Sequence, residues 1–513
     1  MKLIKQKETV LKIMKLWIKQ NKDLLIMFSL FALSFTLRSL LLINTDDSHG
    51  IAAGRALIAD CFLKNPLDWK ILFNPVHPPL HLLSLVCGLR IYDDPLLVPR
   101  VISLLWGSLF VFPFFYFVKE SFNRRIAAFS GIAVALYSEH IVYSIIGTSE
   151  TMFNFLLFSG LALYCLFKKK SSIKMLFFSA VCIGLSCLCR YEGILFIPII
   201  AFFLRDKPKD LGLFLFISII PVGVWSFINL NISGNPITFL STNDITVPLQ
   251  YNWLRSGGLD ISLIYKLLFW PRCLIDTMGI LMFVFGIAGV CLCVCVRKKV
   301  FPSVLFLLLF LIFVIRTVQE QLYLQPRYSI ILGLMLIPFS LFAFFAGVRY
   351  LKQEKLVILV WILLGAMIAP IGERVLAEPL YVPEFVKDIG KYVGDNFSGN
   401  GHILVDHCGD ENFREPIKLW SKINPCYFII PPYEYASDGS RVVVDSRRFF
   451  EVLHDYRVSM LVYSSGGGLG RLLNFEKDKK NYLKEGFLFK LDFARGPYDV
   501  YTVKEVSDND QDM

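Results

Sequence analysis

The sequence predicts a polytopic α-helical membrane protein with about eleven transmembrane helices and interfacial helices in its first outer loop, followed by a C-terminal α/β domain. Hydrophobic residues make up 55% of the 513 residues, and the mean hydropathy is +0.56. Charged residues make up 19%, below the roughly 25% of an average soluble domain. Apolar runs of about 20 residues, the length that crosses the hydrocarbon core, recur along most of the chain.

The net charge of +11 comes from 53 Lys and Arg residues against 42 Asp and Glu residues. The basic residues fall in short clusters between apolar runs, which is typical of the cytoplasmic loops of membrane proteins. We therefore expect no nucleic-acid partner. The same distribution predicts a multi-pass protein of the plasma or inner membrane with a cytoplasmic N-terminus.

The predicted transmembrane domain, residues 24–378, follows a basic cytoplasmic arm, residues 1–23. Its expected helices are 24–43, 100–118, 126–146, 150–167, 174–189, 191–204, 211–230, 277–296, 301–317, 328–348 and 356–372. Every second loop is basic, so the intervening segments are expected outside. These outer segments are 44–99, 147–149, the break at 190, 231–276, 318–327 and everything after 372. The first apolar run lacks a small-residue cleavage site, so no cleavable signal peptide is expected.

The first outer loop, residues 44–99, is too long for a simple connection. Two amphipathic stretches, Ile51–Leu63 and Leu80–Tyr92, are too short and too polar to cross the bilayer securely, so we expect helices in the interface plane. Between them lies NPVHPPL, residues 74–80, where consecutive prolines favour an extended turn. The alternative interpretation of this stretch is a helix breaker with no further role.

The C-terminal segment, residues 379–513, is predicted to form an extracytoplasmic α/β domain. Short β-rich runs alternate there with amphipathic stretches at 383–394 and 445–457. The β-rich runs are His402–Asp406, Tyr427–Ile430, Met460–Tyr463, Phe487–Phe493 and Tyr498–Val503. The glycine-rich sequence SSGGGLG, residues 464–470, does not match the dinucleotide fingerprint GxGxxG in register, so we expect a flexible loop.

The 12 cysteines do not indicate a metal site. Half of them lie in apolar helical runs, where cysteine behaves as a small hydrophobe. The cysteines expected outside are Cys61, Cys273, Cys408 and Cys426, and a Cys408–Cys426 disulfide is one option. No cofactor is assigned, and whether the protein needs a divalent metal stays open.

The pair Asp46-Asp47 follows directly after the first apolar run, in LLINTDDSHGIAAGRAL. A carboxylate pair at the mouth of a transmembrane helix is costly unless water or a substrate meets it. The pair therefore predicts a functional site at the outer surface of the membrane.

Charged side chains also occur at three other outward breaks. Glu150 opens one predicted helix, Arg190-Tyr191-Glu192 separates two apolar segments, and Arg327-Tyr328 begins another helix. Each group also has a structural interpretation: a helix N-terminal charge, a self-neutralising ion pair, or interfacial anchors. Because broken helices at membrane depth usually line a cavity, we expect these groups to share one site with Asp46.

The order of these motifs resembles a known family. The strings TDDSHGIAAGRAL, NPVHPPLHLLSL, LLVPRVISLLWGSL, GTSETMFNFLLFSGLALY, CLCRYEGILFIP and QPRYSIILGLMLIP look like those of the C-type, lipid-phosphate-dependent membrane glycosyltransferases. The nearest branch contains protein O-mannosyltransferases and the bacterial transferases that add aminoarabinose to lipid A. The resemblance covers roughly residues 24–350.

The resemblance implies roles for particular residues. Asp46 falls at the position of the catalytic acid, and Asp47 stands where the family usually has Glu. Glu150 is the acidic residue of the second loop. The residues expected to bind the lipid phosphate or the sugar are Arg190, Arg327, Arg100, His77, Tyr191, Glu192 and Tyr328, with His77 standing where Lys is common. The implied donor is a sugar linked to polyprenyl or dolichyl phosphate, and the implied acceptor is a glycan, lipid or protein.

Sugar transfer from a lipid phosphate needs a base for the acceptor hydroxyl and cations for the departing phosphate. A single carboxylate base fits inversion, because retention would require a second carboxylate as nucleophile about 5 Å away. The main alternative is a secondary transporter, whose midplane charges and broken helices would look similar. A transporter of that kind is expected to contain an internal repeat, and the hydropathy pattern shows none.

Overall fold

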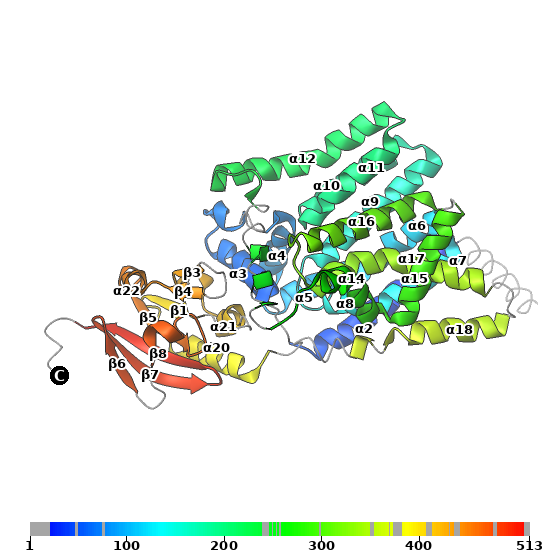
Figure 1. Ribbon diagram of the computed structural model, residues 1–513. Helices are drawn as coiled ribbons and strands as arrows, with labels where there is room; N and C mark the ends of the chain where they lie inside the picture. The colour runs from blue at the N-terminus through cyan, green and yellow to red at the C-terminus, as the bar shows by residue number, and fades with distance from the viewer. Residues whose placement is uncertain are drawn as a thin grey trace, which may run out of the picture.

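The computed structural model consists of a bundle of apolar helices and a C-terminal sheet domain, with α3 (Gly50–Lys64), α20 (Glu384–Asn396) and α21 (Arg414–Ser421) between them (Figure 1). The structure describes residues 21–46, 50–73, 77–238, 246–248, 250–252, 254–255, 258–296, 299–348, 353–368, 370–372, 382–406, 413–429, 431–435, 442–475 and 480–506. The basic arm up to residue 20, Asp47 and Cys408 lie outside these ranges.

The helices of the membrane domain follow one another along the chain. The first are α2 (Lys22–Ile43), α3, α4 (Pro79–Ile91), α5 (Val98–Leu109), α6 (Val111–Ser121), α7 (Arg124–Ala135), α8 (Ser138–Val142), α9 (Glu150–Lys170), α10 (Ile173–Cys187), η2 (Tyr191–Leu195), α11 (Phe196–Leu204) and α12 (Pro208–Ser233). The later ones are α14 (Leu263–Met278), α15 (Ile280–Cys295), α16 (Val300–Val318), η3 (Pro326–Tyr328), α17 (Ser329–Gly347) and α18 (Gln353–Gly365).

Six helices in the described ranges are long and apolar enough to cross a membrane. They are Lys22–Ile43, Val98–Ser121, Glu150–Lys170, Pro208–Ser233, Val300–Val318 and Pro326–Gly347. Shorter apolar helices include α10 and α15. The predicted fold class is confirmed, while the expected number of transmembrane helices stays a prediction. The two expected interfacial helices are present as α3 and α4, within one residue of the predicted bounds.

One predicted helix boundary in the membrane domain was wrong, and one helix was missed. The expected helix 126–146 ends at Ala135, because Leu136 and Tyr137 leave helical geometry before the five-residue α8. The expected outer loop 231–276 contains α14, whose Lys266, Arg272 and Asp276 hide its apolar face from a hydropathy average. Gly279, with φ of +82°, separates α14 from α15.

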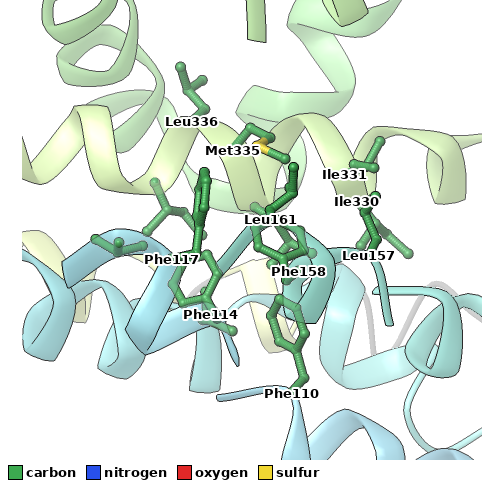
Figure 2. Close-up of a cluster of buried hydrophobic side chains, with 14 of the residues drawn as sticks. Phe110, Phe114, Phe117, Leu157, Phe158, Leu161, Ile330, Ile331, Met335 and Leu336 are labelled. Atoms are coloured by element: carbon green, nitrogen blue, oxygen red, sulfur yellow. The ribbon is translucent and has the colours of Figure 1, made fainter. Parts of the chain in front are cut away.

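Buried aromatic and aliphatic side chains hold the centre of the bundle together. Figure 2 shows Phe114 and Phe117 of α6 and Phe158 of α9 packed beneath Met335 and Leu336 of α17. α17 is buried on nearly every side, as expected for a helix that is apolar all round. This packing fixes the N-terminal end of α17, where η3 and the Arg327 side chain lie.

The C-terminal domain contains a six-stranded mixed sheet in the order β2-β1-β5-β8-β7-β6. Its strands are β1 (His402–Val405), β2 (Phe428–Ile429), β5 (Val458–Ser464), β6 (Asn481–Lys484), β7 (Phe487–Arg495) and β8 (Tyr498–Glu505), and β3 (Tyr433–Tyr435) and β4 (Val442–Val444) form a separate antiparallel pair. β1 is parallel to β2 and β5, whereas β8 is antiparallel to β5 and β7.

Side chains alternate between two cores on the faces of this sheet. Ile403 and Val462 face α20 and α21, while Leu404 and Leu461 face α22 (Ser446–Asp455). All five predicted β-rich runs and both amphipathic helices are confirmed. Sequence reasoning missed β6, the β3–β4 pair and the eight-residue α21. The SSGGGLG segment connects β5 to the short helix α23 (Gly470–Leu473), consistent with the expected loop.

The C-terminal domain lies on α3 of the membrane domain. Leu419 of α21 packs against Ala53, Ala56 and Leu57 of α3. A cavity of about 280 Å³ next to this contact is lined by both parts, including Asp60 and Lys418. The first outer loop therefore forms the platform on which the C-terminal domain rests.

Candidate active site

Arg190 is the centre of a buried charge cluster at the break between α10 and η2. Its backbone is extended, with φ of −152° and ψ of 140°, so the helix stops there and the side chain turns into the bundle. The guanidinium forms an ion pair with Glu150 at the start of α9, and its Nη2 lies 2.6 Å from Oε1 of Glu192. Only 11% of the Arg190 side chain is exposed.

Arg327 extends this cluster from η3. Its Nη1 lies 3.9 Å from Oε1 of Glu150, and 13% of its side chain is exposed. The Tyr328 ring centre is 5.2 Å from the guanidinium carbon of Arg190 and equally far from that of Arg327. The ring thus holds two like charges near one carboxylate, through cation–π contacts with both.

Arg55 of α3 is a member of the cluster that sequence reasoning missed. It is 8% exposed, and its Nε and Nη1 are buried with no hydrogen-bond partner in the described part of the chain. Glu150, Arg190 and Arg327 all act on it electrostatically. The sequence signal for its burial is that Arg55 lies among the small residues Ala52, Ala53, Ala56 and Ala59. All of these side chains are buried in α3.

Two histidines lie beside the arginines. Burial, and then the charges of Arg55 and Arg327, lower the pKa of His77 to about 3. His77 is therefore neutral at physiological pH and adds no positive charge to this cluster. His81 is 1% exposed, and both of its ring nitrogens lack a hydrogen-bond partner among the described residues.

The cluster borders a small cavity of about 20 Å³, room for about one water. Its polar lining includes Glu150, Arg190 and Arg327, and its apolar lining includes Phe153 and Phe313. In the part of the chain that the structure describes, the charged groups of this cluster are the guanidiniums of Arg55, Arg190 and Arg327 and the carboxylates of Glu150 and Glu192. Cations outnumber anions in this cluster, and unpaired guanidinium N–H groups remain for an anionic ligand.

Asp46 forms its ion pair and its hydrogen bond with the C-terminal domain. Its Oδ2 lies 2.5 Å from Nζ of Lys387 in α20, and its Oδ1 accepts a 3.1 Å hydrogen bond from the backbone N–H of Val382. Burial lowers the pKa of Lys387, but hydrogen bonds to Asp46 and Glu384 outweigh it and raise that pKa overall. The Asp46 side chain is 35% exposed, so it is accessible to a ligand.

The remaining predicted residues hold neighbouring segments in place. Arg100 donates to the carbonyl of Ile145 at 2.8 Å, to that of Leu42 at 3.2 Å and to Oγ1 of Thr45 at 2.6 Å. It thereby fixes the end of α2 immediately before Asp46. The Tyr191 hydroxyl accepts a 3.2 Å hydrogen bond from Nε1 of Trp225. No group of three or more metal-ligating side chains occurs within the described ranges.

Comparison with known proteins gives a direct match over part of this region. Residues 76–225 match the family described as dolichyl-phosphate-mannose-protein mannosyltransferase. This range begins just before His77 and includes Glu150, Arg190 and Glu192. No curated protein matches the chain at the level of overall sequence.

The overall fold is similar to that of solved membrane proteins. ArnT from Cupriavidus metallidurans bound to undecaprenyl phosphate superposes with a TM-score of 0.63 at 13% identity, over 92% of this chain and 97% of ArnT. The chain has the fold of the C-type membrane glycosyltransferases. The archaeal oligosaccharyltransferase AglB from Archaeoglobus fulgidus, solved with an inhibitory peptide and a dolichol-phosphate, gives a TM-score of 0.59 at 13% identity, over 87% of this chain and 70% of AglB. The resemblance noted in the motifs and the prediction of a glycosyltransferase are confirmed by these matches.

Proposed function

We propose that this C-type glycosyltransferase transfers a sugar, with inversion, from polyprenyl or dolichyl phosphate to an acceptor hydroxyl on the extracytoplasmic side of the membrane. The observation that carries the proposal is the buried arginine cluster, above all the unpaired Nε and Nη1 of Arg55. A buried guanidinium without a partner is costly in the free protein and favourable once an anion binds. The solved relatives with undecaprenyl phosphate and dolichol-phosphate make a lipid phosphate the natural anion.

The cluster suits the chemistry at the phosphate. As the glycosidic bond breaks, the donor phosphate diester becomes a monoester and gains negative charge on its oxygens. Guanidiniums that are already in place stabilise this charge without reorganisation. Arg55 and Arg327 carry this role, because Arg190 is shared between Glu150 and Glu192. The apolar residues of the cavity lining, such as Phe153 and Phe313, begin the path of the lipid tail.

Asp46 is the proposed general base. Its side chain is more exposed than those of Glu150 and Glu192, which pair with guanidiniums. Glu150 and Glu192 serve as counter-ions to Arg190 and not as nucleophiles. Asp46 is then the single carboxylate that becomes available when an acceptor displaces Lys387, which favours direct displacement with inversion. The outgoing proton passes from the acceptor hydroxyl to Asp46 once the acceptor has displaced Lys387. Asp47 is proposed to orient the acceptor.

The proposed orientation rests on basic residues gathered at one end of the bundle. Lys119 and Arg124 both pair with Asp23 at the start of α2. Lys169 pairs with Glu120 at 2.9 Å, and Lys299 donates to the carbonyl of Phe122 at 3.2 Å. Basic loops of this kind stay in the cytoplasm. We therefore propose that residues 1–23 are cytoplasmic, that the membrane domain covers 24–378 and that residues 379–513 form an extracytoplasmic domain.

The test is transfer by the purified protein from a radiolabelled polyprenyl-phosphate sugar to a panel of glycan, lipid and peptide acceptors. Asp46→Asn keeps the side-chain shape but cannot accept the proton, so transfer is expected to fall by about 10²–10⁴-fold while donor binding persists. Asp47→Asn is expected to cost less. Full transfer by Asp46→Asn would remove the mechanism. Absence of transfer by the wild type, with substrate uptake into sealed vesicles, would favour the transporter.

A further inference from the structure

Two cysteines from distant parts of the chain meet where the C-terminal domain rests on α3. The Sγ atoms of Cys61 in α3 and Cys426 in η4 (Pro425–Tyr427) lie 2.8 Å apart, although the residues are 365 positions apart in sequence. Both are free thiols in the structure. We propose that Cys61 and Cys426 form a disulfide that joins the first outer loop to the C-terminal domain in the mature protein.

The folded surroundings place the two sulfurs. Cys426 is held in η4 by Asn424, whose Oδ1 accepts a 3.1 Å hydrogen bond from the Cys426 backbone N–H. On the opposite side, Asn65 of the first outer loop donates from Nδ2 to Sγ of Cys426 at 2.8 Å. Because a disulfide has an S–S distance of about 2.05 Å, the sulfurs need to approach by less than about 1 Å. No large backbone movement is required.

Further contacts between the first outer loop and the C-terminal domain surround the two cysteines. Leu419 of α21 packs on the alanine face of α3, about one to two helical turns before Cys61. Asp60, next to Cys61, pairs with Lys64 at 2.6 Å and lines the 280 Å³ cavity together with Lys418. The cysteine contact is therefore part of a packed interface and not an accidental approach of two mobile ends.

Oxidation needs an external disulfide oxidant, such as oxidised glutathione or a thiol oxidase of the exported compartment. Cys426 is the exposed partner, so its thiolate attacks the oxidant, releases one thiolate and forms a mixed disulfide. Cys61 then loses its proton and attacks Sγ of Cys426, which releases the second thiolate. Two thiols thus lose two protons and two electrons, and the oxidant is reduced to two thiols.

The microenvironment explains the order of these steps. Burial, the hydrogen bond with Cys426 and the charge of Cys426 raise the pKa of Cys61 to about 12. A thiol with a raised pKa is a poor first nucleophile in solution. Its position beside Cys426 makes it effective as the second one, because the reaction is then intramolecular.

The first experiment treats the purified full-length protein with oxidised glutathione, blocks remaining thiols and maps linked peptides by mass spectrometry. We expect a peptide pair joining Cys61 to Cys426 in the wild type and its loss in both Cys61→Ser and Cys426→Ser. Cys87→Ser, which removes another exposed cysteine of the first outer loop, is the matched control and is expected to keep the linkage. Asn65→Leu is expected to slow formation several-fold.

Two results would overturn the proposal at this stage. One is that Cys426 remains as a glutathione adduct or a free thiol, and the other is that it links to Cys408 instead. A second experiment blocks thiols in intact cells before lysis. The linkage is expected there as well, because the proposal rests on the extracytoplasmic placement in the proposed function.

The two experiments separate failure of the disulfide from failure of the proposed function. Free thiols in cells together with a linkage in the oxidised purified protein would reject the disulfide of the mature protein. If a topology reporter also placed the C-terminus in the cytoplasm, the proposed orientation would fail. If the reporter remained external, the orientation would stand and the disulfide alone would be rejected.

Discussion

Asp46, at the end of α2, and Lys387, in the first helix of the C-terminal domain, form an ion pair with 2.5 Å between Oδ2 and Nζ. The Val382 N–H occupies the other oxygen of Asp46. The proposed base is thus held at both oxygens by the domain that follows the membrane helices. An acceptor hydroxyl has to compete with Lys387 for Asp46 before it can give up its proton.

Lys387→Met is therefore expected to lower the acceptor KM. An ion pair of this exposure contributes about 0.2–1 kcal/mol, so the change should reach up to about fivefold, with donor binding unchanged. Lys391→Met, one turn further along α20, is the matched control, since Lys391 contacts the Trp420 ring and not Asp46. Steady-state transfer kinetics measure both. An unchanged acceptor KM with a reduced kcat would instead assign Lys387 to positioning Asp46.

Arg55 and Arg190 are expected to respond in opposite ways when replaced by Met. Arg55→Met removes a buried cation whose Nε and Nη1 have no described partner, so stability of the free protein should stay equal or rise. Its affinity for undecaprenyl phosphate should fall about 10- to 150-fold, the worth of a charge-assisted hydrogen bond of about 1.5–3 kcal/mol.

Arg190→Met leaves Glu150 and Glu192 without their shared partner and should lower the unfolding temperature. Arg272→Met is the control, because the Arg272 side chain is 78% exposed. It should change neither the unfolding temperature nor the affinity for undecaprenyl phosphate. Thermal unfolding in detergent, with and without undecaprenyl phosphate, gives both readouts. Wild-type lipid affinity in Arg55→Met would exclude Arg55 from the phosphate site.

Gly289 in α15 allows close contact with α17. A Cβ added there would overlap the Phe339 carbonyl oxygen, so Gly289→Ala forces the two helices apart. We expect a loss of about 1–3 kcal/mol in the free energy of unfolding, typical of overpacking. Gly223→Ala in α12 is the control, because nothing lies within 4 Å of its added Cβ. The free energy of unfolding of the Gly289→Ala and Gly223→Ala variants is measured in mixed micelles. Equal stability of the two variants would contradict the close contact between α15 and α17.

The gathering of Lys119, Arg124, Lys169 and Lys299 at one end of the bundle predicts the orientation. A reporter fused after residue 513 should be active outside, and one fused at Lys170 should be active in the cytoplasm. The reverse pattern would place Asp46 and the arginine cluster on the cytoplasmic side. It would then contradict the proposed site of transfer.

Local patterns in the sequence were sufficient for most elements. The bounds of α3 and α4 followed from amphipathic runs between prolines and polar residues, and the strands of the C-terminal domain followed from β-rich runs. Hydropathy averages failed where charge is mixed into an apolar face, as in α14, and where a break occurs inside an apolar run, as at Leu136 and Tyr137. An average over a window does not register which side of a helix is buried.

The sequence by itself predicted that Glu150, Arg190, Glu192, Arg327 and Tyr328 share one site, because charge at a helix break within a membrane domain is costly without a purpose. Only the tertiary structure decided that Arg55 joins them, that Lys387 pairs with Asp46 and that Cys426 meets Cys61. The physical reason is that these partners lie on different helices or domains. Their approach depends on how whole elements pack, which no local periodicity encodes.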